Sequence, residues 1–284
     1  MGDQLRVKLW GVRGSIPTPV TANLGYGGNT ICIEVRCAGL PPIILDGGSG
    51  LRELGVALTR EFPAGGACHI FFTHFHWDHI QGIPFFIPIY HPGWQMNFHS
   101  VHKPEVLEGY LMDQMRAPYF PVSMPAALAA RTYTRVPEKG TRMGDLRITP
   151  FALHHPNGAH GYRLEAAGHA IVFAFDHEHG DEAVDRGLIK HAAGADILIY
   201  DAQYTVEEYE ARKGWGHSTW VQAVRIAKAA GVKQLVLIHH DPMHADDVIA
   251  GLVEQARELF PNTVGATEGW THVFTPQGAP HAGR

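Results

Sequence analysis

The sequence contains few cysteines and no long apolar stretch, and both absences exclude whole classes of protein. Three cysteines among 284 residues, with no pair at CxxC spacing, argue against a disulfide framework. No apolar run approaches the roughly 20 residues that cross a bilayer. The opening residues enter a strand-like pattern directly, without the basic and apolar regions of a signal peptide. We therefore expect a soluble, cytoplasmic protein with no membrane partner.

The sequence also lacks an excess of basic residues. Lys and Arg number 23 against 28 Asp and Glu, so the formal charge is −5. Tight binding to a nucleic-acid backbone requires clustered Lys and Arg. Nucleic acid is therefore an open but less favoured partner, since a local basic patch is compatible with a negative total. Histidine, by contrast, is abundant, with 20 copies.

The pattern of apolar residues predicts a mixed α/β (α+β) fold. Short β-branched runs bounded by Gly, Pro, Asp or His predict strands, and apolar residues at helical spacing predict helices. The strands are expected over 5–10, 30–36, 42–46, 68–73, 146–153, 161–166, 170–175, 196–200 and 234–239, and the helices over 50–62, 105–115, 182–193, 219–230 and 246–260. This order favours sheets packed together with helices outside. No linker-like composition divides the chain, so we expect a single domain over 1–284.

One segment, 84–135, is rich in proline and aromatic residues and directly follows a cluster of histidines. We interpret it as a connection that folds over another part of the molecule. A packed surface loop and a lid or insertion that contacts substrate are equally compatible with this composition.

The stretch FTHFHWDHIQG places His74, His76, Asp78 and His79 within six positions. Burying imidazoles and carboxylates without partners is costly, so packing alone does not explain the cluster. His74 and His76 point to the same side of an extended chain, and Asp78 and His79 begin the following helix. Imidazole and carboxylate groups are ordinary ligands of zinc and similar ions. The stretch therefore predicts a metal site at the end of a strand.

Other predicted strands also end in residues that can bind a metal. Histidine pairs follow two of these strands, at His154–His155 and His239–His240, and Asp176 follows a third. Their common position after apolar runs suggests that they meet at one edge of the sheets. Within each pair, either histidine can be the ligand.

HFHWDH resembles the HxHxDH motif of the metallo-β-lactamase fold superfamily, and further motifs follow in the same order. The resemblance implies a four-layer αββα sandwich that binds two divalent metal ions, Zn in the first place and Mn or Fe as alternatives. It assigns His74, His76 and His155 to the first metal, Asp78, His79 and His239 to the second, Asp176 to both, and Asp46 to a structural role. His155 is preferred to His154 because the sequence HPNG, which begins at His155, resembles the corresponding motif of the family. His239 is preferred to His240 because it continues its strand.

Two further segments, LIYDAQYT and KGWGHSTW, are similar to the acidic motif and the HST motif of the phosphodiesterase branch. This branch includes ribonuclease Z and cyclic phosphodiesterases. The resemblance implies that Asp201 orients His217, which protonates the leaving group. Asp78 completes the expected catalytic set. Alternatively, His217 merely precedes a helix whose N-cap is Ser218.

The resemblance also narrows the range of expected substrates. Single-domain ribonuclease Z enzymes carry a long arm between the third and fourth motifs, whereas only a short hairpin separates His155 from Asp176 here. A cyclic nucleotide or another small phosphodiester is therefore expected, attacked by a metal-bridging hydroxide. Arg13, Ser15 and Asn29 would then lie near the site, beside the ligands or facing phosphate, and an ordinary turn is an equally good interpretation of each.

Other functions remain as alternatives. The second is a ribonuclease Z-like endonuclease acting on tRNA 3′ ends. Further alternatives are a thioester hydrolase or another metallo-hydrolase, and a weakly active metal-binding sensor. A homodimer is expected only by analogy with relatives.

Overall fold

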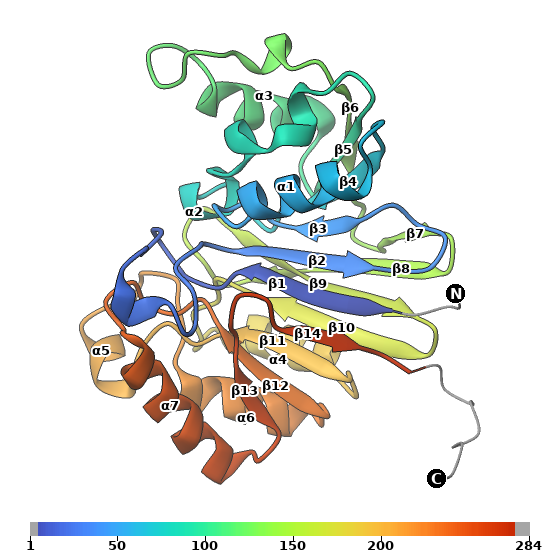
Figure 1. Ribbon diagram of the computed structural model, residues 1–284. Coiled ribbons are helices and arrows are strands. Elements are labelled where there is room, and N and C mark those ends of the chain that lie inside the picture. The colour runs from blue at the N-terminus through green and yellow to red at the C-terminus, as the bar shows by residue number, and fades with distance from the viewer. Residues whose placement is uncertain (1–4, 276–284) are drawn as a thin grey trace, which may run out of the picture.

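Two seven-stranded sheets stack face to face, and helices cover both outer faces (Figure 1). This computed structural model describes residues 5–275. The expected four-layer αββα sandwich is confirmed. The strand ends that carry the histidine motifs lie together at one edge of the two sheets.

The first sheet is built mainly from the N-terminal half of the chain. Its strand order is β14-β1-β2-β3-β4-β5-β6. The strands are β1 (Arg6–Gly11), β2 (Cys32–Arg36), β3 (Ile43–Leu45), β4 (Ala67–Phe71), β5 (Gln95–Ser100), β6 (Ala130–Arg135) and β14 (Thr271–Val273). From β3 to β6 the strands run parallel, so their carboxyl ends share one edge.

The second sheet comes from the C-terminal half, in the order β13-β12-β11-β10-β9-β8-β7. Its strands are β7 (Thr141–Met143), β8 (Leu146–Leu153), β9 (Ala159–Ala166), β10 (His169–Ala174), β11 (Ile197–Asp201), β12 (Gln234–Ile238) and β13 (Thr263–Gly265). Strands β10 to β13 are parallel, and β7 to β10 are antiparallel neighbours. The ends of β8, β10, β11 and β12 can therefore meet at one edge.

Seven α-helices accompany the sheets within the described residues, and five of them are long enough to cover a face. They are α1 (Leu51–Glu61), α2 (Trp77–Ile80), α3 (Pro104–Gln114), α4 (Glu182–Ala192), α5 (Val206–Glu210), α6 (Trp220–Ala230) and α7 (Asp246–Leu259). Helices α1 and α3 pack on the first sheet, and α4, α6 and α7 pack on the second. The short α2 and α5 lie near the edge with the histidine motifs (Figure 1).

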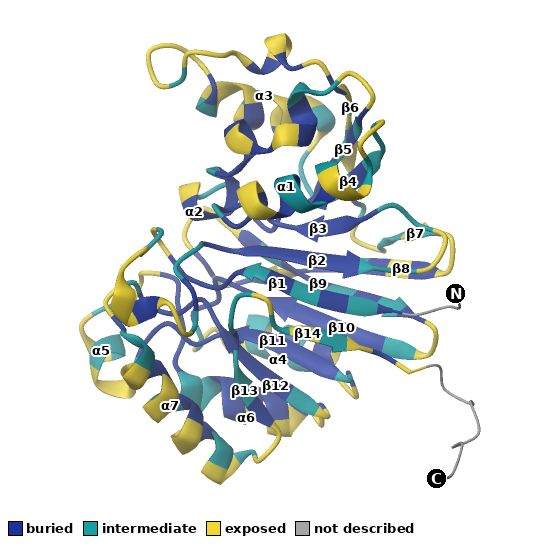
Figure 2. Cartoon of the chain, in the orientation of Figure 1, coloured by how far each residue is buried: buried dark blue, intermediate teal, exposed yellow. Residues whose placement is uncertain are grey.

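Burial follows this layering. One apolar cluster fills the space between the sheets, and two others join each sheet to its helices. In α1, Leu51, Leu54 and Leu58 are buried at three- and four-residue spacing, which gives the helix one apolar face. Figure 2 shows the buried strands and inward helix faces against exposed outer faces. Among the described residues, no helix is both long enough and apolar enough to cross a bilayer.

The interpretation of 84–135 as a mere connection is wrong for two of its parts. Strands β5 and β6 lie in this segment and extend the first sheet. In β5, Met96 and Phe98 are buried while their neighbours Gln95 and Asn97 are not, which is ordinary strand alternation. The surrounding prolines and aromatic residues concealed this short pattern. The short strands β7, β13 and β14 were also not predicted.

Candidate metal-dependent active site

The predicted ligands come from separate strand ends that the fold brings together. His74 and His76 follow β4, Asp78 and His79 lie in α2, and the remaining ligands follow strands of the second sheet. These are His155 after β8, Asp176 after β10 and His239 after β12.

Sharp turns of the backbone aim several of these side chains. Asp46, Asp176 and His239 have positive φ angles of 59°, 53° and 63°. Left-handed backbone is uncommon outside glycine, although Asp and His tolerate it better than β-branched residues do. Such strain at three strand ends around one site is typical of functional regions.

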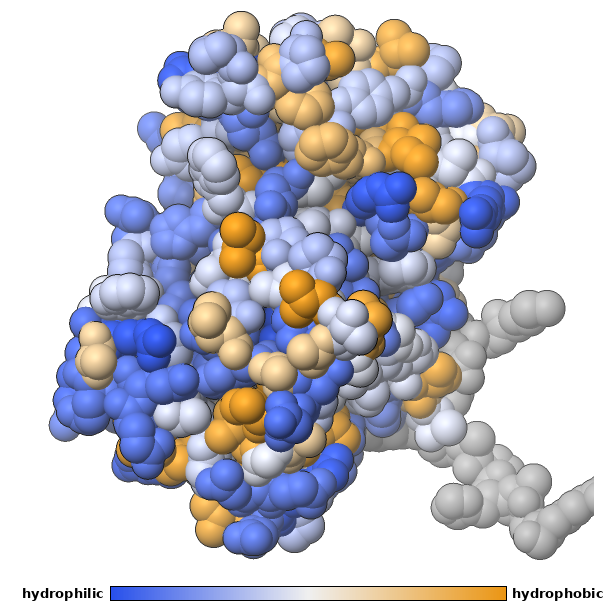
Figure 3. Space-filling model, turned by 60° about the vertical axis from the view of Figure 1, so that its left-hand side comes forward, coloured by the Kyte–Doolittle hydropathy of each residue, from blue (hydrophilic) through white to orange (hydrophobic). Residues whose placement is uncertain are grey.

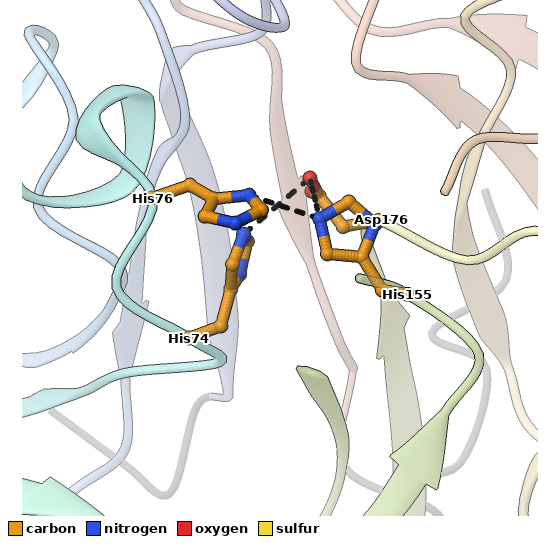
Figure 4. Close-up of side chains that lie close together, drawn as sticks. All are labelled: His74, His76, His155 and Asp176. Carbon is orange, nitrogen blue, oxygen red and sulfur yellow. Dashed lines mark hydrogen bonds and ion pairs between the residues drawn. The ribbon is translucent and has the colours of Figure 1, made fainter. Parts of the chain in front are cut away.

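His74, His76 and His155 form the first ligand group, and with Asp176 they point toward one another (Figure 4). Their candidate ligand atoms all lie within 4.8 Å of one another. Oδ2 of Asp176 lies 3.6 Å from Nε2 of both His74 and His155. Nδ1 of His76 lies 3.0 Å from Nε2 of His155. Three imidazoles and one carboxylate oxygen thus surround a small common space.

Asp78, His79 and His239 form the second ligand group, on the other side of Asp176. Oδ1 of Asp176 lies 3.0 Å from Nε2 of His79 and 3.2 Å from Nε2 of His239. Oδ2 of Asp78 lies 3.3 Å from Nε2 of His239. The two oxygens of Asp176 therefore face different ligand groups.

The residues present fit divalent cations. Nε2 of His74, Nε2 of His79 and Oδ1 of Asp176 are buried without a hydrogen-bond partner among the described residues. Unsatisfied buried polar atoms are costly, and a cation at each group would satisfy them. We therefore assign the cluster to the binding of divalent metal ions.

Each imidazole of the second ligand group is held by a buried partner through its outer nitrogen. His79 donates from Nδ1 to Oδ2 of Asp46 (2.7 Å), and His239 donates from Nδ1 to Oε1 of Gln203 (2.8 Å). Oδ2 of Asp78 accepts the backbone N–H of Ser15 (2.7 Å). With a proton on Nδ1 alone, the lone pair of Nε2 would face the site, as metal ligation requires.

The first ligand group has weaker outer partners. His74 donates to Oγ1 of Thr73 (3.0 Å), and His155 donates to the carbonyl of Gly216 (2.7 Å). His76 is only half-buried, and its Nε2 lies 3.4 Å from the amide nitrogen of Asn157. Within residues 5–275, no carboxylate hydrogen-bonds an imidazole of this group from outside.

Electrostatics also differ between the groups. In the first, burial lowers the pKa of His74 well below its usual value and that of His155 to about 4, so both imidazoles are neutral near pH 7. In the second, burial alone would lower the pKa of His239, but the carboxylates of Asp176 and Asp78 outweigh it and raise the pKa to about 9. Burial would likewise lower the pKa of His79, but the neighbouring carboxylates outweigh it and raise that pKa. The second group thus lies in the more negative field.

Asp201 and His217 form a pair next to the second ligand group. Nδ1 of His217 donates to Oδ2 of Asp201 at 2.9 Å, and Asp201 is fully buried. Oδ1 of Asp201 accepts the backbone N–H groups of Gln203 (3.0 Å) and Ser218 (3.3 Å). The ring of His217 stacks on that of His239 with centroids 4.8 Å apart. The carboxylate therefore sets the tautomer and orientation of His217.

The loop that carries His217 is anchored by Glu178, a residue that the sequence interpretation missed. The buried carboxylate of Glu178 accepts the backbone N–H groups of Gly214 (2.7 Å) and Gly216 (2.8 Å) and the hydroxyl of Tyr209 (3.1 Å). Gly216 has a φ of 90°, and a Cβ there would lie 2.1 Å from Nδ1 of His155. Glycine is therefore required at this position.

Gln203 and Thr73 were also missed as partners of ligands. For Glu178 and Thr73, the position near a ligand in the chain could have indicated a role: Glu178 stands two positions after Asp176, and Thr73 directly precedes His74. Nothing in the sequence pattern pairs Gln203 with His239, because their contact depends on the neighbouring ends of β11 and β12.

The structure places the members of each histidine pair differently. His154 is exposed and contacts the carbonyl of Glu178, while His155 faces the site. His240 is buried against the carbonyl of Ala266, while His239 faces the site.

The structure shows the hydrogen bonds of three other residues singled out in the sequence. Asn29 bonds Glu268 and Ser49, and among residues 5–275 no hydrogen bond joins it to a candidate ligand. Arg13 is buried and donates to three backbone carbonyls. The expected N-cap at Ser218 is wrong by one residue, because Thr219 accepts from the N–H of Gln222.

Residues 43–240 match the beta-lactamase superfamily domain. A ribonuclease Z of Haloferax volcanii is 25% identical over 321 residues, covering 96% of this chain and 95% of the relative. The metallo-beta-lactamase fold protein YhfI from Bacillus subtilis superposes with a TM-score of 0.72 at 19% identity, over 96% of this chain and 100% of that one. A diphosphatase of the PhnP family superposes with a TM-score of 0.71 at 18% identity, over 96% and 98%.

The chain belongs to the beta-lactamase superfamily, and its fold is the metallo-β-lactamase fold. It is similar to proteins named ribonuclease Z and to a diphosphatase of the PhnP family. With its cluster of histidines and aspartates, it is a metal-dependent hydrolase.

Proposed function

We propose that the protein is a dinuclear phosphodiesterase that hydrolyses a cyclic nucleotide or another small phosphodiester. The pairing of His217 with buried Asp201, stacked on a candidate metal ligand, is the observation that supports this most strongly. The names of the ribonuclease Z and diphosphatase relatives agree with action on phosphate esters.

In this proposal each ligand group holds one cation, with Zn favoured and Mn or Fe as alternatives. When bound, the two cations supply an activated water and neutralise charge that develops on the phosphate oxygens. Asp176 faces both groups with one oxygen each and holds them at a defined separation.

The proposed catalytic role of His217 follows from its position. Asp201 binds Nδ1, and Nε2 has no hydrogen-bond partner among the described residues. Nε2 is therefore the atom that would give a proton to the departing oxygen, a step typically worth 10²–10⁴-fold in rate. Asp78 contributes as a ligand carboxylate held by the N–H of Ser15.

A second candidate function is cleavage of tRNA 3′ ends. It is favoured by the relatives named ribonuclease Z, one of which aligns with nearly the whole chain. Between His155 and Asp176, however, the described chain contains only the hairpin of β9 and β10, so an RNA-binding arm at this place is absent. A thioester or other metallo-hydrolase and a weakly active sensor are further alternatives. The cytoplasmic location and the homodimer stay predictions.

A substrate panel tests the proposal. Purified protein loaded with Zn²⁺ or Mn²⁺ should hydrolyse bis(p-nitrophenyl) phosphate and at least one cyclic nucleotide, and the His217→Ala variant should retain its metals. A fully metallated protein that hydrolyses no phosphodiester would contradict the proposal. Turnover restricted to tRNA precursor, with steep salt dependence of binding, would favour the second candidate instead.

A further inference from the structure

A surface cavity of about 490 Å³ lies between α2 and the end of α3. Aromatic side chains form part of its wall: Phe75, Trp77, Tyr110 and Tyr119 line it, together with Ile80, Arg116 and three further polar residues. The volume is within the usual range for small-molecule sites. We call this cavity the aromatic pocket.

Two residues of the aromatic pocket adjoin the first ligand group in the chain, although no candidate ligand lines the pocket. Phe75 and Trp77 directly flank His76 in the chain, and consecutive Cα atoms are only about 3.8 Å apart. The pocket therefore begins one residue away from a candidate metal ligand.

The chemistry of the pocket suits a flat, partly polar ring. Trp77 is 79% exposed and Tyr119 is 70% exposed, so large aromatic faces remain available to a ligand. The guanidinium of Arg116 lies 5.9 Å from the centre of the Tyr119 ring. Gln81, Gln114 and Asp113 also line the pocket and carry groups that form hydrogen bonds. Nucleobases stack on aromatic rings and on guanidinium planes.

The surroundings agree with a local binding function. The upper part of the molecule, which includes α3, carries several apolar side chains among polar ones, whereas the lower left of the same view is largely hydrophilic (Figure 3). Tyr110 is held against Phe75 with ring centroids 4.8 Å apart, so one wall is ordered by contact with the ligand-bearing loop.

We propose that the aromatic pocket binds the base of a nucleotide substrate whose phosphodiester lies at the two ligand groups. This inference rests on the proposed phosphodiesterase function and specifies its substrate class. It also gives residues 110–119 of the segment 84–135 a role in substrate binding.

Two substrates with the same leaving group test the inference. Thymidine 5′-(p-nitrophenyl phosphate) carries a base, and methyl p-nitrophenyl phosphate does not. For the metal-loaded protein we expect a higher kcat/KM for the thymidine ester. In Trp77→Ala and Tyr119→Ala, the ratio of the two kcat/KM values should fall roughly ten-fold, mainly through the KM of the thymidine ester. The control Leu128→Ala changes an exposed apolar residue of the same segment outside the pocket and should leave the ratio unchanged.

The outcomes separate the inference from the function on which it rests. If the protein hydrolyses both esters and the pocket variants leave their ratio unchanged, the aromatic pocket does not bind the base, although the phosphodiesterase function stands. If neither ester is hydrolysed by metallated protein, the proposed function fails. In that case the affinity for thymidine 5′-monophosphate is measured by calorimetry. Weaker binding by Tyr119→Ala than by the unchanged protein supports the aromatic pocket as the base site, and equal binding contradicts it.

Discussion

The two ligand groups use similar side chains but are built differently. The second group, Asp78, His79 and His239, is buried and is held from outside by Asp46, Gln203 and the N–H of Ser15. The first group includes the half-buried His76, and its outer partners are a hydroxyl, a backbone carbonyl and a distant amide. Hydrogen-bonded partners raise the basicity of a ligand and fix its orientation. The second group should therefore bind its cation more tightly, and the first should exchange its cation more readily.

Removal of a shared ligand should have the largest effect, because Asp176 faces both groups. Asp176→Ala is expected to lose both cations and all measurable activity. His155→Ala and His239→Ala should each keep about one cation per chain, since each leaves the other group intact. Metal content measured by elemental analysis after gel filtration checks this.

His154→Ala is the matched control, because His154 is adjacent in the chain but exposed and outside both groups. Equal metal content in the Asp176 and His155 variants would show that the groups do not share Asp176.

His217→Ala should come next, with a fall of about 10²–10⁴-fold in kcat for esters with an alkoxide leaving group. The fall should be much smaller for p-nitrophenyl esters, which depart without a proton, and the metal content should be unchanged. Asp201→Asn should show the same dependence on the leaving group in weaker form. An equal loss for good and poor leaving groups would contradict proton donation by His217.

Substitution of the outer hydrogen-bond partners should affect metal binding differently at the two ligand groups. Asp46→Asn is expected to weaken metal binding at the second group by about 10–100-fold, because His79 loses a buried carboxylate partner. Asn157→Ala should have little effect on the first group, because its contact with His76 is 3.4 Å long and exposed. Competition with a chromophoric chelator measures both affinities.

Thermal unfolding of the metal-free variants shows whether Asp46→Asn acts through general stability. If Asn157→Ala weakens metal binding as much as Asp46→Asn does, the two groups do not differ in the way proposed.

Glu178→Gln should have the smallest effect among the changes expected to impair the protein, roughly ten-fold on kcat, because small displacements of a catalytic group are costly. Its neutral amide can present only one oxygen to the N–H groups of Gly214 and Gly216, so the loop that carries His217 is held less firmly. KM and metal content should remain close to those of the unchanged protein.

Glu207→Gln, in exposed α5, is the control for loss of a carboxylate. A Glu178→Gln variant that keeps full kcat would exclude a positioning role for this residue.

The four candidate ligands between His74 and His79 were the easiest to predict. They follow one strand within six residues, so their side chains lie together for local reasons. The other ligands are single residues after separate strands, and only the resemblance to the family distinguished His155 from His154. At His239 the backbone turns to a φ of 63°, which breaks the alternation that would otherwise identify its face.

The sequence by itself determined strands β1–β4 and β8–β12, the five long helices and the residues able to bind metal, because apolar periodicity and strand-end chemistry are local properties. Only the tertiary structure decided which atoms meet: the two oxygens of Asp176 face different ligand groups, Gln203 binds His239, and Glu178 holds the loop before His217. These contacts join segments far apart in the chain. The packing of two sheets sets their distances, and no short pattern of residues encodes it.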